Sequence, residues 1–242
     1  AAAGAIVITT KKGKEGTATV GVNSRVGANW VNKLPELQKK YKLGTNPDGK
    51  LMDLNTNLSW GDPFASGETI YNNLEDFFET GYTYDNSFNV SGATAKNNYY
   101  LSGAHLKQTG IVPTTDYGRY NFRFNGEQKL GIFTFGANAA YSQSQTTKTL
   151  TGTGLWGSGG NGYMESIIAY PQSADMRDYL NADGSQKFLY RRGDTPEAIL
   201  ENSMDNPYWT IYKNPQTDKT NRFLGTFYTN AQLTDWLNFT YR

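Results

Sequence analysis

Alternation of apolar and polar residues is the dominant pattern along this chain. Between Tyr117 and Glu127, every second position carries Arg or Asn in one half of the pattern and Tyr or Phe in the other. A period of two residues is typical of a β-strand with one face in an apolar environment and the other in water. The pattern recurs, and it predicts strands near residues 16–28, 84–95, 98–108, 117–128, 131–145, 222–233 and 236–242.

The connections between these predicted strands alternate in length. Tight turns are expected near residues 95–97, 129–131 and 234–235, whereas residues 29–83 and 146–221 form very long connections. Outer-membrane β-barrels have this asymmetry, with short periplasmic turns and long extracellular loops. In a soluble β-sandwich there is no physical reason for the short loops to lie at one end of the strands and the long loops at the other. The pattern therefore favours an all-β membrane protein, an antiparallel transmembrane barrel in which both long loops are extracellular.

The polar side of the central strands supplies the first candidate site residues. In a transmembrane barrel the apolar side of each strand faces lipid and the polar side faces a watery lumen. Alternation then directs four side chains toward the lumen: Arg119, Asn121, Arg123 and Asn138. This assignment depends on register, because a shift of one residue moves every side chain to the opposite face.

The long loops contain a predicted helix and the second group of candidates. Apolar residues from Ile70 to Phe78 recur at helical spacing, which predicts a short amphipathic helix that packs the loop onto the barrel. Aromatic side chains in extracellular loops can stack on sugars or peptides, or can serve to pack the loops. The candidates for such stacking are Trp60, Trp156 and Tyr163.

Composition removes several classes of function. Lys and Arg number 23 and Asp and Glu 22, so the basic excess expected of a nucleic-acid-binding protein is missing. The chain has no Cys and only one His, His105, which leaves no cysteine nucleophile and no multi-histidine metal site. The glycines of residues 152–157 match a dinucleotide-binding pattern, but the strand before them alternates where that motif needs an apolar one. We expect no enzyme activity, cofactor or metal.

Short motifs spread along the chain resemble one family in their order. Residues Gly4–Lys14 read GAIVITTKKGK, and residues Ser59–Phe64 read SWGDPF. Residues Asp76–Ser87 read DFFETGYTYDNS, and residues Asp205–Trp209 read DNPYW. Together they resemble the SusC/RagA family of TonB-dependent outer-membrane transporters. In that family the first motif is the final strand of an internal plug domain, and the others belong to the barrel.

The resemblance implies a parent barrel of about 22 strands with a plugged lumen. Residues 1–14 would be the last plug strand and its connector, residues 15–242 would be the first part of the barrel, and the chain would be a piece of a longer protein. The implied function is TonB-dependent import of a nutrient, an oligosaccharide or an oligopeptide, across the outer membrane. The implied partners are a SusD-like surface lipoprotein, the TonB complex through a segment outside this chain, and outer-membrane lipid. The alternative is a non-transporting surface β-protein, such as an adhesin or glycan-binding module.

Overall fold

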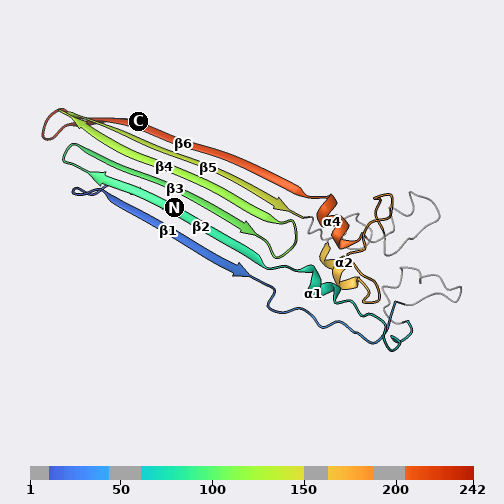
Figure 1. Cartoon of the computed structure of the whole chain (residues 1–242). Coiled ribbons are helices and arrows are strands. Elements are labelled where there is room, and N and C mark those ends of the chain that lie inside the picture. The colour runs from blue at the N-terminus through green and yellow to red at the C-terminus, as the bar shows by residue number, and fades with distance from the viewer. Residues whose placement is uncertain (1–10, 44–60, 150–162, 188–204) are drawn as a thin grey trace, which may run out of the picture.

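The computed structural model describes residues 11–43, 61–149, 163–187 and 205–242. These residues form one antiparallel sheet in which each strand pairs with its neighbours in sequence (Figure 1). The prediction of an antiparallel all-β sheet is thereby confirmed. The strands are β1 (Thr19–Asn29), β2 (Gly81–Ala93), β3 (Asn97–Thr109), β4 (Asp116–Leu130), β5 (Phe133–Lys148), β6 (Gln216–Gln232) and β7 (Asn238–Tyr241). The helices are α1 (Asn73–Phe77), α2 (Tyr163–Ala169) and α4 (Pro207–Lys213).

Short turns lie at one end of the sheet, and the helices and longer connections lie at the other (Figure 1). The β4–β5 turn consists of Gly131 and Ile132, and Gly131 has φ +60°, which fits a two-residue hairpin with glycine in its first position. In the β2–β3 turn the hydroxyl of Thr94 accepts hydrogen bonds from the backbone N–H groups of Lys96 and Asn97, each at 3.2 Å. The β6–β7 connection spans residues 233–237 and is longer than the tight turn expected there.

Strands β5 and β6 continue further toward the helical end than alternation predicts. Strand β6 begins at Gln216 and not near residue 222, and Lys148 at the end of β5 pairs with it. The added residues are polar on both sides of the sheet, so they carry no period-two signal. An ion pair of 2.7 Å between Lys148 and Asp218 joins the two strands there.

The predicted helix in the first long loop is shorter than its apolar spacing suggests. Helix α1 is a single turn in which Leu74 and Phe77 are buried, whereas Ile70 precedes it and is partly exposed. It ends at Phe77, and the backbone of the next residue, Phe78, is already extended. None of the described helices has the length and apolarity needed to cross a membrane.

The two faces of the sheet differ in chemistry. One face, here called the apolar face, exposes large hydrophobic side chains from every strand. They include Val22, Tyr84, Phe88, Leu101, Tyr120, Phe122, Phe124, Phe133, Tyr141, Phe223, Phe227 and Phe239. The opposite face, here called the polar face, carries mostly Asn, Ser, Thr and Arg. Water-soluble monomers rarely expose an apolar patch of this extent.

Apart from Ala231 on β6, the buried apolar side chains of the described residues gather at the helical end of the sheet. They are Leu74, Phe77, Val112, Tyr163, Ile167, Tyr170, Met176, Tyr208 and Ile211. We refer to α1, α2, α4, residues 170–187 and residues 205–206 as the loop cluster. Its parts come from both long connections, so it joins segments that are far apart in the chain.

Candidate functional site

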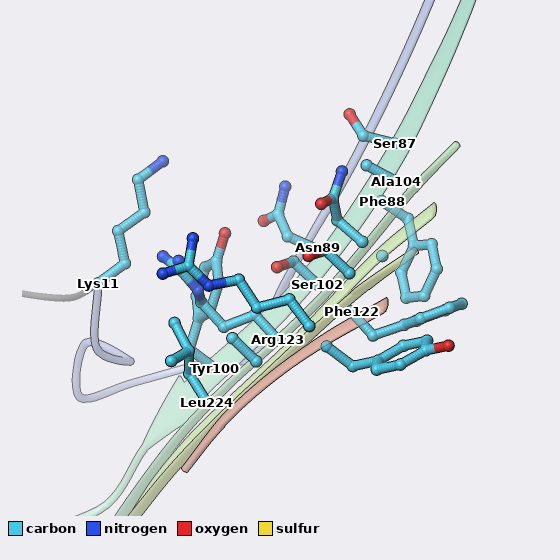
Figure 2. Close-up of a pocket in the computed structure, with 16 residues that line it drawn as sticks. Lys11, Ser87, Phe88, Asn89, Tyr100, Ser102, Ala104, Phe122, Arg123 and Leu224 are labelled. Carbon is cyan, nitrogen blue, oxygen red and sulfur yellow. The ribbon is translucent and has the colours of Figure 1, made fainter. Parts of the chain in front are cut away.

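A hollow of about 730 Å³ lies on the polar face at the middle of the sheet. Ser87, Asn89, Ser102 and Arg123 project into it from β2, β3 and β4, and Lys11 stands opposite them (Figure 2). The rings of neighbouring residues such as Phe122 project from the other side of the sheet, as alternation requires (Figure 2). The hollow is therefore lined by hydroxyl, amide and cationic groups together with apolar atoms, such as those of Leu224 and Ala140.

The four side chains predicted to face a lumen share the polar face. In the β4–β5 register Asn125 lies opposite Asn138 and Asn121 lies opposite Ser142, which places Arg119, Arg123 and Asn138 on one side of the sheet. Asn121 and Arg123 line the hollow, and Arg119 lies further toward the helical end. That this face lines a lumen stays a prediction.

The structure adds two cations that sequence reasoning did not select. Arg222 on β6 lines the same hollow as Arg123, and Lys11 approaches from the segment before β1. The position of Arg222 next to Phe223 in an alternating strand was a readable signal for its face. Its distance from Arg123 was not readable, because the β5–β6 register spans a long loop.

The segment before β1, residues 11–18, lies against the polar face, and we call it the connector. The side-chain amide of Asn125 donates to the carbonyl of Lys11 at 3.0 Å, and Lys12 forms an ion pair of 2.6 Å with Glu127. A Cβ atom on Gly13 would collide with the carbonyl oxygen of Gly92, so the close approach requires glycine. The polar face is thus covered in part by the chain itself, whereas the connector leaves the apolar face bare.

Glu127 is the centre of a small polar cluster beneath the connector. Besides Lys12, its carboxylate accepts a hydrogen bond from the amide of Asn98 at 2.5 Å and one from the hydroxyl of Tyr228. These partners come from the connector, β3 and β6. The carboxylate therefore ties the connector to three strands of the sheet.

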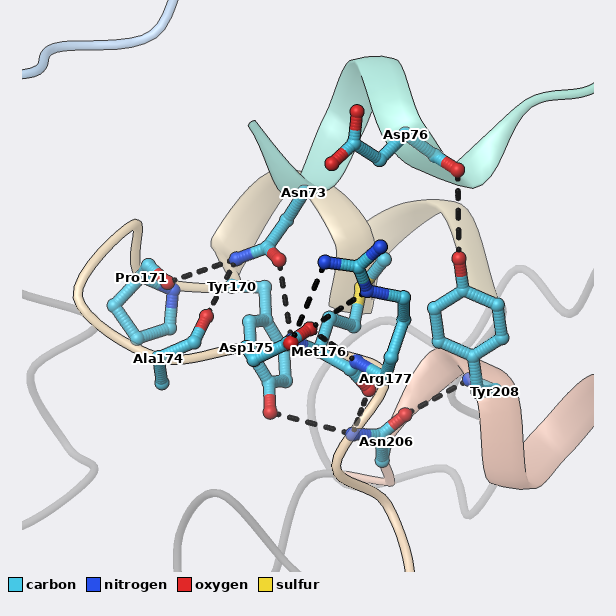
Figure 3. A network of polar contacts seen from close by, with 10 residues as sticks. All are labelled: Asn73, Asp76, Tyr170, Pro171, Ala174, Asp175, Met176, Arg177, Asn206 and Tyr208. Atoms are coloured by element: carbon cyan, nitrogen blue, oxygen red, sulfur yellow. Dashed lines mark hydrogen bonds and ion pairs between the residues drawn. The ribbon is translucent and has the colours of Figure 1, made fainter. Parts of the chain in front are cut away.

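Two buried asparagines hold the loop cluster together (Figure 3). The amide of Asn73 donates to the carbonyls of Pro171 and Ala174 at 3.1 and 2.8 Å, and its oxygen accepts from the N–H of Met176. The amide of Asn206 donates to the carbonyl of Met176 at 2.9 Å, and its oxygen accepts from the N–H of Tyr208 at 2.8 Å, which caps α4. Buried amides with all these bonds fix one arrangement of the three helices.

The aromatic candidates in the loops have different outcomes. Trp60 and Trp156 lie outside the described residues. Tyr163 is only 8% exposed, and its ring stacks on Phe77 with centroids 5.7 Å apart, so it packs the loop cluster. Tyr212, another aromatic residue of the second long loop, is partly exposed, and its ring stacks on that of Tyr208 with centroids 6.0 Å apart.

Several ionisable groups of the loop cluster are buried in it or paired with one another. Burial raises the pKa of Tyr163 and of Tyr208 above the usual tyrosine value. Burial also acts to raise the pKa of Asp175, but hydrogen bonds and the charge of Arg177 outweigh it and hold that pKa below its usual value. Asp178 pairs in turn with Lys187. Paired surface carboxylates of this kind do not form an acid–base couple. Among the described residues, no group of His, Asp and Glu is placed to hold a metal ion.

Comparison with solved structures places the sheet in a known architecture. The chain superimposes on a chain of the RagAB peptide importer in its open-open state with a TM-score of 0.57, at 17% sequence identity. The closed-closed state of the same importer gives a TM-score of 0.56 at 16% identity. The chain shares that fold. In both cases the match covers 96% of this chain and 28% of the importer chain.

The likeness concerns structure more than sequence. No protein-family model matches this chain, and no curated relative matches its sequence. The matched region includes nearly all of the present chain, so the sheet and its helical end correspond together to one part of the importer chain.

Proposed function

We propose that this chain is part of the barrel wall of a TonB-dependent outer-membrane importer for oligopeptides or oligosaccharides. The observation that carries the proposal is the inverted distribution of side chains on the sheet. Large apolar residues cover the face that the connector leaves bare, and the connector lies on the polar face. A strand in a membrane barrel has this arrangement, with lipid outside and a polar, plugged interior.

The height of the apolar band supports a lipid environment. On β4 large apolar side chains of this face lie between Leu130 at the turn and Tyr120, with Gln128 and Gly126 among them, and beyond Tyr120 the face continues with Gly118 and Asp116. Ten residues of a strand tilted by about 45° span roughly 25 Å, the height of the apolar band of such barrels. The strands then extend past the membrane boundary and carry the loop cluster above it.

Peptide cargo is the first class to test, because both solved structures reported above are of a peptide importer. Oligosaccharides are the second class, implied by the SusC/RagA resemblance. That resemblance also supports a SusD-like lipoprotein at the loop end and a TonB-binding segment outside this chain. The loop cluster would then form part of the surface that meets the lipoprotein.

Two measurements on the full-length protein in its native membrane test the proposal. The protein should resist extraction by alkaline carbonate and require detergent, because lipid covers the apolar face. Uptake of labelled peptides or oligosaccharides should fall in a strain that lacks the protein and recover when the full-length chain is restored. Release by carbonate would rule out the wall assignment, and unchanged uptake with detergent-dependent extraction would favour the adhesin or glycan-binding alternative.

A further inference from the structure

Cations exceed carboxylates on the polar face of the seven described strands. Each carboxylate on this face lies next to a cation. The pairs are Asp85 opposite Arg25 in the β1–β2 register, Glu127 with Lys12 at 2.6 Å, and Asp218 with Lys148 at 2.7 Å. The carboxylates of the polar face are therefore all next to a cation, and the remaining cations of this face have no carboxylate beside them among the described residues.

Four cations of this face, Arg119, Arg123, Lys129 and Arg222, have no carboxylate partner among the described residues, and Arg123 and Arg222 are the two that line the hollow. Neither guanidinium forms an ion pair or hydrogen bond with another residue in the part of the chain that the structure describes. Both side chains are exposed and line the same hollow. An arginine presents five N–H donors in a planar fork, so two unpaired arginines offer a large capacity for an anion.

The register brings these two arginines within reach of one ligand. Arg123 lies opposite Ala140 on β5, and Arg222 lies opposite Ser142, two residues further along the same strand. With neighbouring strands about 4.8 Å apart and a two-residue step of about 6.8 Å, their Cα atoms are about 12 Å apart. Two long side chains can converge across that distance, and the small residues on β5 leave the space between them open.

The connector contributes a third cation from the other side. Lys11 stands off the sheet and faces Arg123 across the hollow (Figure 2). Its backbone carbonyl is fixed by Asn125, which limits the positions its ammonium group can reach. A ligand in the hollow would thus meet cations from the wall and from the connector at once.

We propose that Arg123, Arg222 and Lys11 form a binding subsite for a carboxylate group of the cargo. The importer would consequently prefer acidic cargo to neutral cargo of the same length. Arginine binds carboxylate through two parallel hydrogen bonds, and pores that pass anions are lined by Arg and Lys in the same way. Ser102, Asn121 and Ser142 line the same hollow and can bind neutral polar groups near the carboxylate. This inference rests on the import function proposed above.

A competition experiment with the purified full-length importer and its lipoprotein tests the subsite. The probes are pairs of peptides that are identical except for Glu or Gln at one position, supplied in equal amounts and identified after binding by mass spectrometry. The wild type should enrich the Glu member roughly tenfold, the effect expected of one charge-assisted pair. The double variant Arg123→Gln/Arg222→Gln should lose this preference and still bind the Gln members as the wild type does.

A matched control separates the subsite from general charge. Arg25→Gln removes an arginine from the same face, but one that lies opposite Asp85, so it should leave the preference for Glu unchanged. If peptides do not bind, the same comparison is made with an oligogalacturonate and a neutral oligosaccharide of equal length. Salt should weaken the preference in the wild type and have little effect in the double variant.

Three outcomes would overturn the inference. A wild type that binds Glu and Gln members equally has no carboxylate subsite, although the import function would stand. If the double variant loses binding of the Glu peptide and of the Gln peptide equally, the arginines hold a carboxylate of the protein itself. Increased entry of a large antibiotic into cells would then accompany the loss of peptide binding. A complex that binds neither peptides nor oligosaccharides would contradict the proposed function as well.

Discussion

The sheet, which we call the wall after the function proposed above, and the loop cluster place their large hydrophobic side chains in opposite ways. The sheet exposes its large hydrophobic side chains, and Phe223 on β6 is 70% exposed. The loop cluster buries them, and Ile167 and Ile211 are fully covered. The wall must therefore obtain its apolar contacts from outside this chain, whereas the loop cluster supplies its own.

This difference indicates which substitutions each region tolerates. On the wall, the face on which a substitution lies should decide its effect on stability, because the proposed function places lipid on the apolar face and water on the polar face. In the loop cluster, the loss of stability caused by a substitution should depend on how many buried contacts the side chain makes, as in the core of a water-soluble protein. The predictions below use pairs of similar changes to separate the two rules.

The largest loss of stability is expected when a charged side chain is introduced on the apolar face. If the apolar face meets lipid as proposed, Phe122→Arg in the full-length protein should cost about 2–4 kcal/mol of stability, because an arginine at the middle of a lipid-facing strand is poorly solvated. Asn121→Arg, one residue away on the polar face, should cost much less. The measurement is the amount of folded, heat-modifiable protein in the outer membrane. Equal yields of the two variants would contradict the assignment of the faces.

Loss of a buried amide should disrupt the loop cluster alone. Asn206→Ala removes the cap of α4 and leaves buried partners unsatisfied, at a cost of about 2–3 kcal/mol. Hydrogen exchange should become faster in α2 and α4 while the heat-modifiable mobility of the wall stays unchanged. Asn214→Ala, at the exposed end of α4, is the matched control and should have little effect. A collapse of the wall in N206A would show that the two regions are not independent.

A methyl group under the connector should have an intermediate effect. Gly13→Ala would push the connector away from Gly92 at a cost of about 1–3 kcal/mol. Hydrogen exchange of residues 11–16 in the full-length protein should then become faster. Gly118→Ala, where a Cβ atom meets open space, serves as the control. If both variants behave alike, the connector does not lie on the polar face.

The smallest change in stability is expected when the pH is raised. Burial raises the pKa of Tyr163 and Tyr208 in the folded loop cluster, so their contribution to stability is complete below the ordinary tyrosine value of 10.0. As the pH rises above that value, the unfolded form loses protons first and the loop cluster is destabilised. Alkaline titration with hydrogen exchange should show this in the wild type and less of it in Tyr208→Phe. If the wild type and Tyr208→Phe are destabilised equally at alkaline pH, Tyr208 does not contribute to the pH dependence.

The faces of the wall were predictable because a strand repeats every two residues. Arg119 and Arg123 on β4 and Asn138 on β5 share a face for that reason alone. Alternation fails where both sides of a strand are polar, and so it placed the start of β6 near residue 222 and not at Gln216. It also cannot relate strands across a long loop, which is why Arg222 was not connected with Arg123.

The loop cluster was less predictable because distant residues decide its structure. Asn73 binds the carbonyl of Ala174, and no local pattern links two residues so far apart. Helices of one or two turns are also too short for a periodic signal. One local signal was available and not used: Asn206 followed by Pro207 is a typical helix start.

The order of the strands has a consequence for how the wall assembles. Pairing β4 with β5 closes only the turn at Gly131, whereas pairing β5 with β6 closes the connection from Lys148 to Gln216. That connection is roughly five doublings longer, and each doubling adds about 0.6 kcal/mol of closure entropy, or about 3 kcal/mol in all. Early docking of α2 on α4 would shorten the free part of this connection before β6 arrives. The loop cluster would then lower an entropic barrier to folding of the sheet.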